Sequence, residues 1–537
     1  MSLNMIIEQN EIAEIKENVN LRRTFAIISH PDAGKTTLTE KLLLYGNAIQ
    51  LAGNVRARRN QQSVTSDWMA MERERGISVT STVLQFPYRG HVVNLLDTPG
   101  HQDFSEDTYR TLMAADSAVM VLDAAKGVEA QTIKLFEVCR RRGIPVFTFI
   151  NKMDRPVDDL LGLLDEVQEV LGMEPAPVNW PLGDGQAFAG VYDRAGGEVH
   201  LYDRSFRNET AAAETITTLD DPLIRERVGE ARLAEFQSNI ELLDALGMNF
   251  DRERFIRGEQ TPVYFGSALT NFGVQLFLDD FVRHAPPPGA YDSSAGPIPA
   301  THPSFSGFVF KIQANMDPKH RDSVAFVRVC SGQFTRGMSL THAASGKTIR
   351  LSRSFKFFAD EREIVTDAYA GDIIGVPGNR QLAIGDTLSG GEVFHFDPIP
   401  RFSPEHFARL INRNISKHKQ FWKGLRQLET EGVMQVLQSK NGPANEPILA
   451  VVGRLQFEVV QARLLDEYGV ATDLAPMPHQ LSRWVNGPEN EIAKLPWGEN
   501  LLQALDVDGR VVALFAMEFY LRYYAEKYPG IHFEMIS

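Results

Sequence analysis

The sequence contains little cysteine, a deficit of positive charge and no long apolar run. Only Cys139 and Cys330 are cysteines among its 537 residues, which excludes a disulfide framework and a cysteine-rich metal site. No apolar run approaches the roughly 20 residues that a membrane-spanning helix needs. The first residues are polar and mostly acidic, unlike a signal peptide. We therefore expect a soluble protein of the reducing cytoplasm that makes no membrane contact.

The charge balance is acidic, with 55 lysines and arginines against 69 aspartates and glutamates and a formal net charge of −14. This balance excludes a uniformly basic nucleic-acid coat, so any RNA contact needs a local basic patch, and we expect no DNA partner. Hydrophobic residues make up 43% of the chain, which is an ordinary globular composition and provides for sizeable cores. The length suits roughly three or four domains.

A phosphate-binding loop is predicted within residues 25–37. The apolar run Phe25–Ile28 predicts a short buried strand, and small residues then lead into a helical pattern. In such a strand–loop–helix unit, free backbone N–H groups and the positive end of the helix dipole face an anion. Lys35 would reach the β- and γ-phosphates of a nucleotide, and Thr36 would offer its hydroxyl to Mg²⁺. The residues assigned to this loop are Ser29, His30, Pro31, Asp32, Ala33, Gly34, Lys35, Thr36 and Thr37.

A second motif follows the buried strand that is predicted at 91–96. It reads Asp97-Thr98-Pro99-Gly100, and an aspartate at the end of such a strand lies beside the phosphate loop, where it can hold Mg²⁺. Gly100 allows its amide to approach a γ-phosphate, because no side chain intervenes. Without this second motif, a chance Gly-Lys-Thr in a surface turn would be a serious alternative, since the loop begins with Ser29 where the usual pattern has glycine.

A third motif, Asn151-Lys152-Met153-Asp154, follows the strand predicted at 144–150 and indicates a guanine base. Guanine presents N1–H and an N2 amino group side by side, so the one carboxylate of Asp154 can accept both hydrogen bonds, and adenine has no matching pair of donors. Asn151 can tie this loop to the phosphate loop, and the stem of Lys152 can cover the ring. The alternative is an ordinary strand-end turn. A fourth loop, Ser267-Ala268-Leu269, would offer its backbone to the base carbonyl.

Two long stretches separate these motifs. Residues 47–82 are polar and show little periodicity, and their place directly before a chemical motif favours a switch over a disordered insert. The interval between Asp154 and Ser267 is far longer than one helix and one strand need. It predicts a helix at about 158–171, a hairpin at 188–202 and acidic helices at about 220–247. A decorative insertion with no function is the alternative for this interval.

Together these stretches resemble the nucleotide-binding domain of the translational GTPases, and the insertion resembles that of elongation factor G. The resemblance implies GTP and GDP as ligands, Mg²⁺ as cofactor, and the ribosome, through its RNA and its proteins, as partner. It gives Ser78 the switch position that usually holds a Mg²⁺-binding threonine, so the predicted metal ligands are Thr36, Ser78 and Asp97. It gives His101 the catalytic role of orienting the attacking water.

Three domains are predicted. An α/β P-loop GTPase domain covers 1–288, with an inserted subdomain at about 156–260. A helix at 5–20 should pack before its first strand, and Pro286–Gly289 marks its end. Alternating strands and glycine turns predict a β-barrel at 300–398, and the order β-α-β-β-α-β predicts an α+β, ferredoxin-like domain at 401–537. A hairpin around Asp508 and a helix at 517–528 complete it.

The first part of the last domain is rich in basic residues. They stand against a single acid, Glu405, and form a candidate contact with ribosomal RNA or protein, although a charge run is more often only a solvated face. These residues are Arg401, Arg409, Arg413, Lys417, Lys419, Lys423 and Arg426.

Over essentially its whole length the chain resembles the bacterial peptide chain release factor 3 family. Elongation factor G continues for two further domains, and elongation factor Tu lacks the long insertion and ends in a barrel. The resemblance implies a monomeric GTPase of translation termination that drives class I release factors off the ribosome after peptide release. The alternatives are another elongation-type ribosomal GTPase and the GTPase regulatory subunit of a metabolic enzyme such as sulfate adenylyltransferase.

Overall fold

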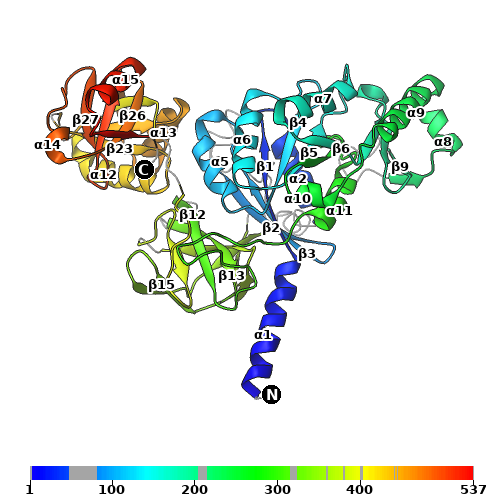
Figure 1. Ribbon diagram of the computed structural model, residues 1–537, viewed down its shortest axis with the longest axis horizontal. Helices are drawn as coiled ribbons and strands as arrows, with labels where there is room; N and C mark the ends of the chain where they lie inside the picture. The colour runs from blue at the N-terminus through cyan, green and yellow to red at the C-terminus, as the bar shows by residue number, and fades with distance from the viewer. Residues whose placement is uncertain are drawn as a thin grey trace.

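The structure is a computed structural model that describes residues 3–46, 81–203, 214–314, 323–358, 361–378, 381–399, 403–440, 442–443 and 445–535. The predicted metal ligand Ser78 lies outside these residues, as do Arg401 and the polar stretch 47–82 up to residue 80. The described chain forms an α/β unit with an inserted subdomain, a β-rich unit and a mixed C-terminal unit (Figure 1). Within the described residues, no helix is long and apolar enough to cross a bilayer.

A seven-stranded sheet forms the centre of the α/β unit as the structure describes it. Its order is β2-β3-β1-β4-β5-β11-β6, and every neighbouring pair is parallel except β2 with β3. The central strands are apolar and buried, as expected for parallel strands covered on both faces. The strands are β1 (Arg22–Ser29), β2 (Thr82–Tyr88), β3 (His91–Asp97), β4 (Ser117–Asp123), β5 (Val146–Asn151), β6 (Glu174–Pro177) and β11 (Gln260–Phe265).

Helices cover both faces of this sheet because successive residues of each strand point to opposite sides. In β1, Phe25 and Ile27 pack into one apolar cluster with α2 (Lys35–Tyr45), α10 (Arg252–Ile256) and α11 (Val274–His284). The neighbouring side chains of the strand pack into the cluster of the opposite face. That cluster contains residues of α5 (Ser105–Leu112), α6 (Ala130–Arg141) and α7 (Leu160–Leu171).

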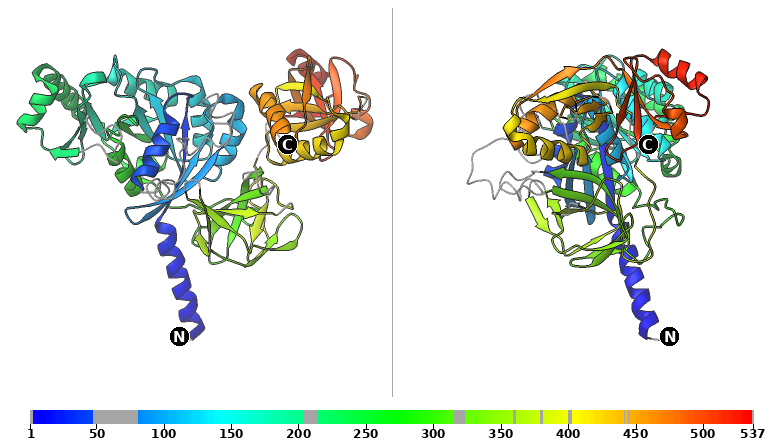
Figure 2. Two further views of the ribbon diagram at one scale, coloured as in Figure 1. Left: turned by 180° about the vertical axis from the view of Figure 1, so that it is seen from behind. Right: turned by 90° about the vertical axis from the view of Figure 1, so that its left-hand side faces the viewer.

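The long interval between Asp154 and Ser267 contributes to two sheets. Helix α7 and strand β6 belong to the central α/β layers, with β6 pairing with β11. The part between β6 and α10 forms a four-stranded sheet of order β10-β9-β8-β7, which includes the expected hairpin. The subdomain lies at the end of the α/β unit opposite the C-terminal unit (Figures 1 and 2). Its elements are β7 (Asn179–Leu182), β8 (Gly190–Asp193), β9 (Glu198–Tyr202), β10 (Glu214–Thr217), α8 (Pro222–Val228) and α9 (Glu230–Ala245).

The β-rich unit surrounds a single apolar cluster, as expected of a barrel. Side chains from eight of its strands meet in that cluster, and every described pairing in the unit is antiparallel. The strands are β12 (Ser306–Ala314), β13 (Ser323–Ser331), β14 (Gln333–Thr335), β15 (Ser339–His342), β16 (Lys347–Arg350), β17 (Phe355–Phe358), β18 (Glu361–Ile364), β19 (Asp367–Tyr369), β20 (Ile373–Pro377) and β21 (Thr387–Ser389).

The C-terminal unit begins with the predicted β-α-β-β-α-β order, and its sheet then continues through a second group of strands. The order of the described sheet is β25-β22-β24-β23-β27-β28-β26-β29. Its elements are β22 (His406–Asn412), α12 (His418–Thr430), β23 (Gln435–Ser439), β24 (Ile448–Val451), α13 (Leu455–Tyr468), β25 (Thr472–Pro476), β26 (Leu481–Asn486), α14 (Glu489–Ile492), β27 (Leu501–Leu505), β28 (Val511–Phe515), α15 (Glu518–Lys527) and β29 (His532–Glu534).

The predicted N-terminal helix forms before the first strand. Helix α1 (Leu3–Asn20) projects away from the α/β unit (Figure 1). Among the side chains that the structure describes in this helix, Ile15 and Val19 are buried against the β-rich unit, whereas Ile12 is exposed. Helical spacing of apolar residues indicates a helix, but it does not show how much of the helix has a partner.

Buried ion pairs fix the β-rich unit to the α/β unit. Arg22 Nε donates to Asp372 Oδ2 at 2.9 Å, and Thr24 Oγ1 donates to the carbonyl of Gly371 at 2.7 Å. The fully buried Arg328 pairs with Asp116 at 2.6 Å. Burial of the guanidinium would lower the pKa of Arg328, but its interactions with Asp116, Tyr291 and Cys330 together outweigh this effect and raise the pKa. The first strand and the β-rich unit are therefore one packed body.

Candidate nucleotide-binding site

The four predicted loops lie at one edge of the central sheet. They follow strands β1, β3, β5 and β11, which run parallel, so their carboxyl ends meet on the same side. The carboxyl edge of such a sheet is where α/β proteins bind ligands. Motifs that lie far apart in the sequence are thus brought together around the start of α2.

The phosphate loop is held in a conformation that only glycine allows at one point. Gly34 has φ of 93°, and a Cβ built on it would lie 2.3 Å from Nδ2 of Asn151. That Nδ2 donates to the carbonyl of Ala33 at 2.8 Å. Asp32 also has a positive φ, 67°, which is rare outside glycine and is found at ligand-binding turns. The base loop and the phosphate loop therefore fix one another.

Replacing Gly34 by alanine should weaken nucleotide binding by about tenfold or more, because a left-handed alanine costs roughly 1–2 kcal/mol and its methyl group would also push Asn151 away. The measurement is a titration with a fluorescent GDP analogue. Gly143→Ala is the matched control, since Gly143 also has a positive φ but a Cβ there meets nothing within 4 Å. Equal affinities for Gly34→Ala and the control would show that this contact does not shape the site.

The opening of the phosphate loop holds a cation and an anion in contact. Lys35 Nζ lies 2.6 Å from Asp97 Oδ1, and both side chains are less than a tenth exposed. Thr98 Oγ1 donates to the carbonyl of Ile27 at 2.5 Å and anchors the second motif to β1. A Cβ on Gly100 would lie 3.6 Å from the backbone of Pro31, so this residue closely approaches the phosphate loop. The second motif therefore lies directly against the phosphate loop.

The donor set at this opening fits a nucleotide-bound Mg²⁺. Thr36 is half-buried at the start of α2, and the carboxylate of Asp97 lies beside the same loop. Mg²⁺ is commonly held by one or two protein oxygens together with phosphate oxygens and water. Two buried polar atoms of the loop, Ser29 Oγ and His30 Nδ1, have no hydrogen-bond partner among the described residues. Such orphaned atoms are typical of a site that is built for a ligand.

The base-side loops are joined by three hydrogen bonds. Asn151 Oδ1 accepts from the amide of Ala268 at 2.9 Å, and Ser267 Oγ donates to Asp154 Oδ1 at 2.5 Å. The amide of Met153 donates to the carbonyl of Gly266 at 3.1 Å. The carboxylate of Asp154 is therefore held in one orientation while remaining partly exposed. Met153 is buried, and the side chain of Leu269 is 67% exposed, so a contact from Leu269 would come from its backbone.

Asp123 was missed from the sequence and lies at the centre of this site. It ends β4 and accepts from Lys152 Nζ at 2.8 Å, and Lys152 also donates to the carbonyl of Asp32. Burial alone would raise the pKa of Asp123, but hydrogen bonds from Lys152 and the amide of Ala125 outweigh it and hold the pKa below its usual value. An acidic residue at the end of a buried apolar strand is the signal that would have found it.

His101 follows Gly100 and is turned toward the next helical turn. Its Nδ1 lies 3.3 Å from Asp103 Oδ1 and 3.2 Å from the amide nitrogen of Asp103. Without a proton, Nδ1 accepts from this amide, and with a proton it faces the carboxylate. The side chain of His101 is one-third exposed, so it lies at the surface of the site, directly after the second motif and beside Asp103.

Family models match three consecutive parts of the chain. The Elongation factor Tu GTP binding domain matches residues 20–287. Elongation factor G domain 2 matches 304–391, and the Class II release factor RF3, C-terminal domain matches 396–525.

Relatives match the chain over nearly its whole length. It is 56% identical to Peptide chain release factor 3 of Gloeobacter violaceus over 97% of this chain and 98% of that protein. It is 55% identical to the protein of the same name from Rippkaea orientalis over 95% of this chain and 94% of that protein. A crystal structure of a protein from Thermus thermophilus shares the fold at a TM-score of 0.67, with 24% identity over 88% of this chain and 71% of that one.

Proposed function

The chain belongs to the peptide chain release factor 3 family, and on that basis we propose how its loops carry out the family's reaction. Its GTP-binding domain and its C-terminal domain are those of a translational GTPase that acts in termination and interacts with the ribosome. The alternatives of another ribosomal elongation factor and of a regulatory subunit of a metabolic enzyme are not favoured. The observation that carries the proposal is the gathering of four motif loops at one sheet edge.

Base selection is assigned to the loops after β5 and β11. The carboxylate of Asp154 accepts from N1–H and from the N2 amino group of guanine, and Ser267 holds it in place. The backbone of Ala268 and Leu269 faces the base carbonyl. The stem of Lys152 covers the ring, its ammonium being fixed by Asp123.

Hydrolysis is assigned to the loops after β1 and β3. Backbone amides of residues 30–37 and the start of α2 bind the phosphates. Lys35 exchanges its contact with Asp97 for the β- and γ-phosphates, and the amide of Gly100 faces the γ-phosphate. His101 orients a water for in-line attack, in which a new P–O bond forms and the bond to the β-phosphate oxygen breaks. GDP and inorganic phosphate leave.

Thr36 and Asp97, with Ser78 from the segment outside the described residues, are the residues that would hold Mg²⁺. When bound, Mg²⁺ supplies neutralising charge to the β- and γ-phosphate oxygens. The hydroxyl of Ser78 can serve as a ligand in the same way as a threonine hydroxyl.

In termination, we infer that GTP binding and hydrolysis remove class I release factors from the ribosome after peptide release, with the protein acting as a cytoplasmic monomer. The test is a reconstituted termination reaction with substoichiometric class I factor. Peptide release should proceed through many cycles only with this protein and GTP. A single cycle under both conditions would reject the recycling role and leave the GTPase activity standing.

The basic residues of the C-terminal unit divide into two groups in the structure. Arg413 pairs with Asp473, and Lys417 Nζ donates to the carbonyl of Gly469 at 2.6 Å, so both have local roles. Lys419, Lys423 and Arg426 lie on α12, where all three are exposed. We assign the ribosomal contact of this unit to that face of α12, where phosphates of RNA would be the partner.

Reversing two charges on this face, with Lys419→Glu and Lys423→Glu, should raise the ribosome concentration that half-saturates GTP turnover by roughly tenfold. The effect should shrink as salt increases, and turnover without ribosomes should not change. Lys134→Glu with Arg141→Glu makes the same change in net charge on α6, where both residues are exposed, and is the control. An equal shift in both double variants would mean that only net charge matters.

A further inference from the structure

The segment from Asp103 to Arg110 is where the α/β unit touches the C-terminal unit. Asp103 lies in the helical turn η1 (Gln102–Phe104), and its Oδ2 accepts from the amide of Leu455 at 2.7 Å. Leu455 is the first residue of α13, so its amide is one of the donors that a helix leaves unsatisfied at its start. Arg454, at the N-cap position, supplies no side-chain cap. The carboxylate of the α/β unit therefore caps a helix of the C-terminal unit.

At Gly453 of the C-terminal unit, the contact is too close to leave room for a side chain. A Cβ on Gly453 would lie 2.1 Å from Cγ and 2.5 Å from Cα of Asp103. Beside it, Phe104 and Val459 form a small buried cluster between the two units. The two backbones thus meet directly at this point, and a single methyl group would separate them.

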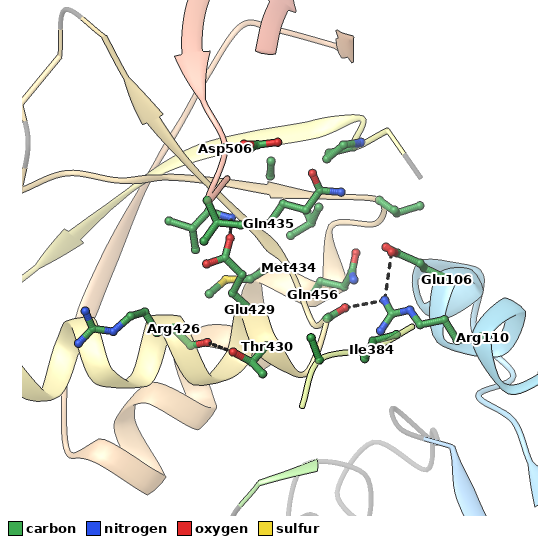
Figure 3. A pocket seen from close by; sticks show the side chains of 18 of the residues that line it. Glu106, Arg110, Ile384, Arg426, Glu429, Thr430, Met434, Gln435, Gln456 and Asp506 are labelled. Atoms are coloured by element: carbon green, nitrogen blue, oxygen red, sulfur yellow. Dashed lines mark hydrogen bonds and ion pairs between the residues drawn. The ribbon is translucent and has the colours of Figure 1, made fainter. Parts of the chain in front are cut away.

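A second contact is made from the neighbouring helix α5. Arg110 Nη2 donates to the carbonyl of Gly432 at 2.9 Å and pairs with Glu106 at 3.1 Å (Figure 3). The C-terminal side of this contact is rigid, because Glu431 and Arg463 of α13 form a buried pair at 2.8 Å. Figure 3 shows Arg110 reaching from α5 toward the loop that follows α12. The start of α13 and the loop at Gly432 therefore bind η1 and α5 as one surface.

The same carboxylate that caps α13 also lies beside His101, the residue proposed to orient the water. Asp103 Oδ1 lies 3.3 Å from His101 Nδ1, while Asp103 Oδ2 accepts a hydrogen bond from the amide of Leu455. One side chain thus connects the water-orienting residue to a helix that begins 352 positions after Asp103 in sequence.

We propose that Asp103 is a positioning residue for His101 and that the docking of α13 on Asp103 makes GTP hydrolysis depend on the position of the C-terminal unit. This inference rests on the proposed role of His101. While the C-terminal unit is docked, Asp103 caps α13 and His101 is held in place. When the unit moves away, Asp103 loses its partner and His101 gains rotational freedom.

Two single variants break the contact from opposite sides. Asp103→Ala removes the carboxylate, and Gly453→Ala leaves the α/β unit intact but inserts a methyl group against Asp103. Each should lower the kcat of ribosome-stimulated GTP hydrolysis by between about tenfold and about a hundredfold, with KM for GTP and GDP affinity unchanged. Gly498→Ala is the control, because Gly498 belongs to the same unit and a Cβ there meets nothing within 4 Å. If KM for GTP rises, or nucleotide affinity falls, by the same factor as kcat falls, the variants are generally damaged and the proposal is overturned.

Double variants test whether Asp103 acts through His101. In the His101→Ala background, adding Asp103→Ala or Gly453→Ala should cause no further loss of kcat, since the residue being positioned is already absent. If instead the kcat of a double variant falls by the product of the two single-variant losses, the proposal is overturned. If His101→Ala itself retains full turnover, the proposed catalytic role of His101 is wrong. If His101→Ala is impaired but Asp103→Ala and Gly453→Ala are both fully active, only the positioning inference is wrong.

Discussion

Replacing His101 by alanine should lower ribosome-stimulated GTP turnover by about 10²- to 10⁴-fold, the range typical of losing a group that handles the attacking water. Affinity for GTP and GDP should change little, because the hydrogen bonds that join the nucleotide loops do not involve this side chain. His101 is one-third exposed and contacts Asp103, so its loss leaves no buried cavity and should not unfold the chain.

The measurement is single-turnover hydrolysis of GTP on ribosomes at saturating protein, alongside equilibrium binding of a GDP analogue. His395→Ala is the matched control, since this histidine is exposed and lies far along the chain, after the last strand of the β-rich unit. Loss of GTP binding in parallel with loss of turnover would assign His101 to nucleotide binding instead. Full turnover would remove it from the reaction.

Changing Asp154 to asparagine should lower GTP affinity by about a hundredfold or more. The carboxylate offers two charge-assisted acceptors to guanine, and hydrogen bonds to charged groups contribute about 1.5–3 kcal/mol each. Asparagine can still accept from N1–H, but its NH₂ group then faces the N2 amino group, so two donors meet. Xanthine carries a carbonyl at that position, and the variant should therefore bind xanthosine triphosphate more tightly than GTP.

Calorimetric titrations of the unchanged protein and of the Asp154→Asn variant with GDP and with xanthosine diphosphate measure this reversal. Asp165→Asn, an exposed change on α7, is the control for loss of one negative charge. Equal weakening toward both nucleotides would mean that Asp154 supports the loop through Ser267 without reading the base.

The central sheet and the binding loops were accessible from the sequence because their signals are local. Buried apolar strands that end in Asp97 and Asn151 carry both the strand and the chemical group in one short segment, and the sheet brings those ends together. The ferredoxin-like order of the C-terminal unit was predicted for the same reason. Strand β2 was missed because it follows a polar stretch directly, and its first residue was assigned to that stretch.

The contacts between units could not be predicted, since no local pattern encodes them. Asp103 reads in sequence as an ordinary acidic residue after a histidine, and its partner Leu455 donates through a backbone amide that any residue except proline possesses. Gly453 carries the only local signal, yet a glycine before a helix is also common in caps. For α1 the sequence showed helical spacing but could not show that Ile15 and Val19 are buried while Ile12 is exposed.

The most direct test of the central claim is a structure of the protein determined with GDP and Mg²⁺. The account predicts a guanine base with N1 and N2 within hydrogen-bond distance of the Asp154 carboxylate. It also predicts phosphates enclosed by the backbone of residues 30–37, with Lys35 moved from Asp97 to the β-phosphate. A nucleotide bound with its base away from Asp154, or with its phosphates outside the loop between β1 and α2, would contradict it.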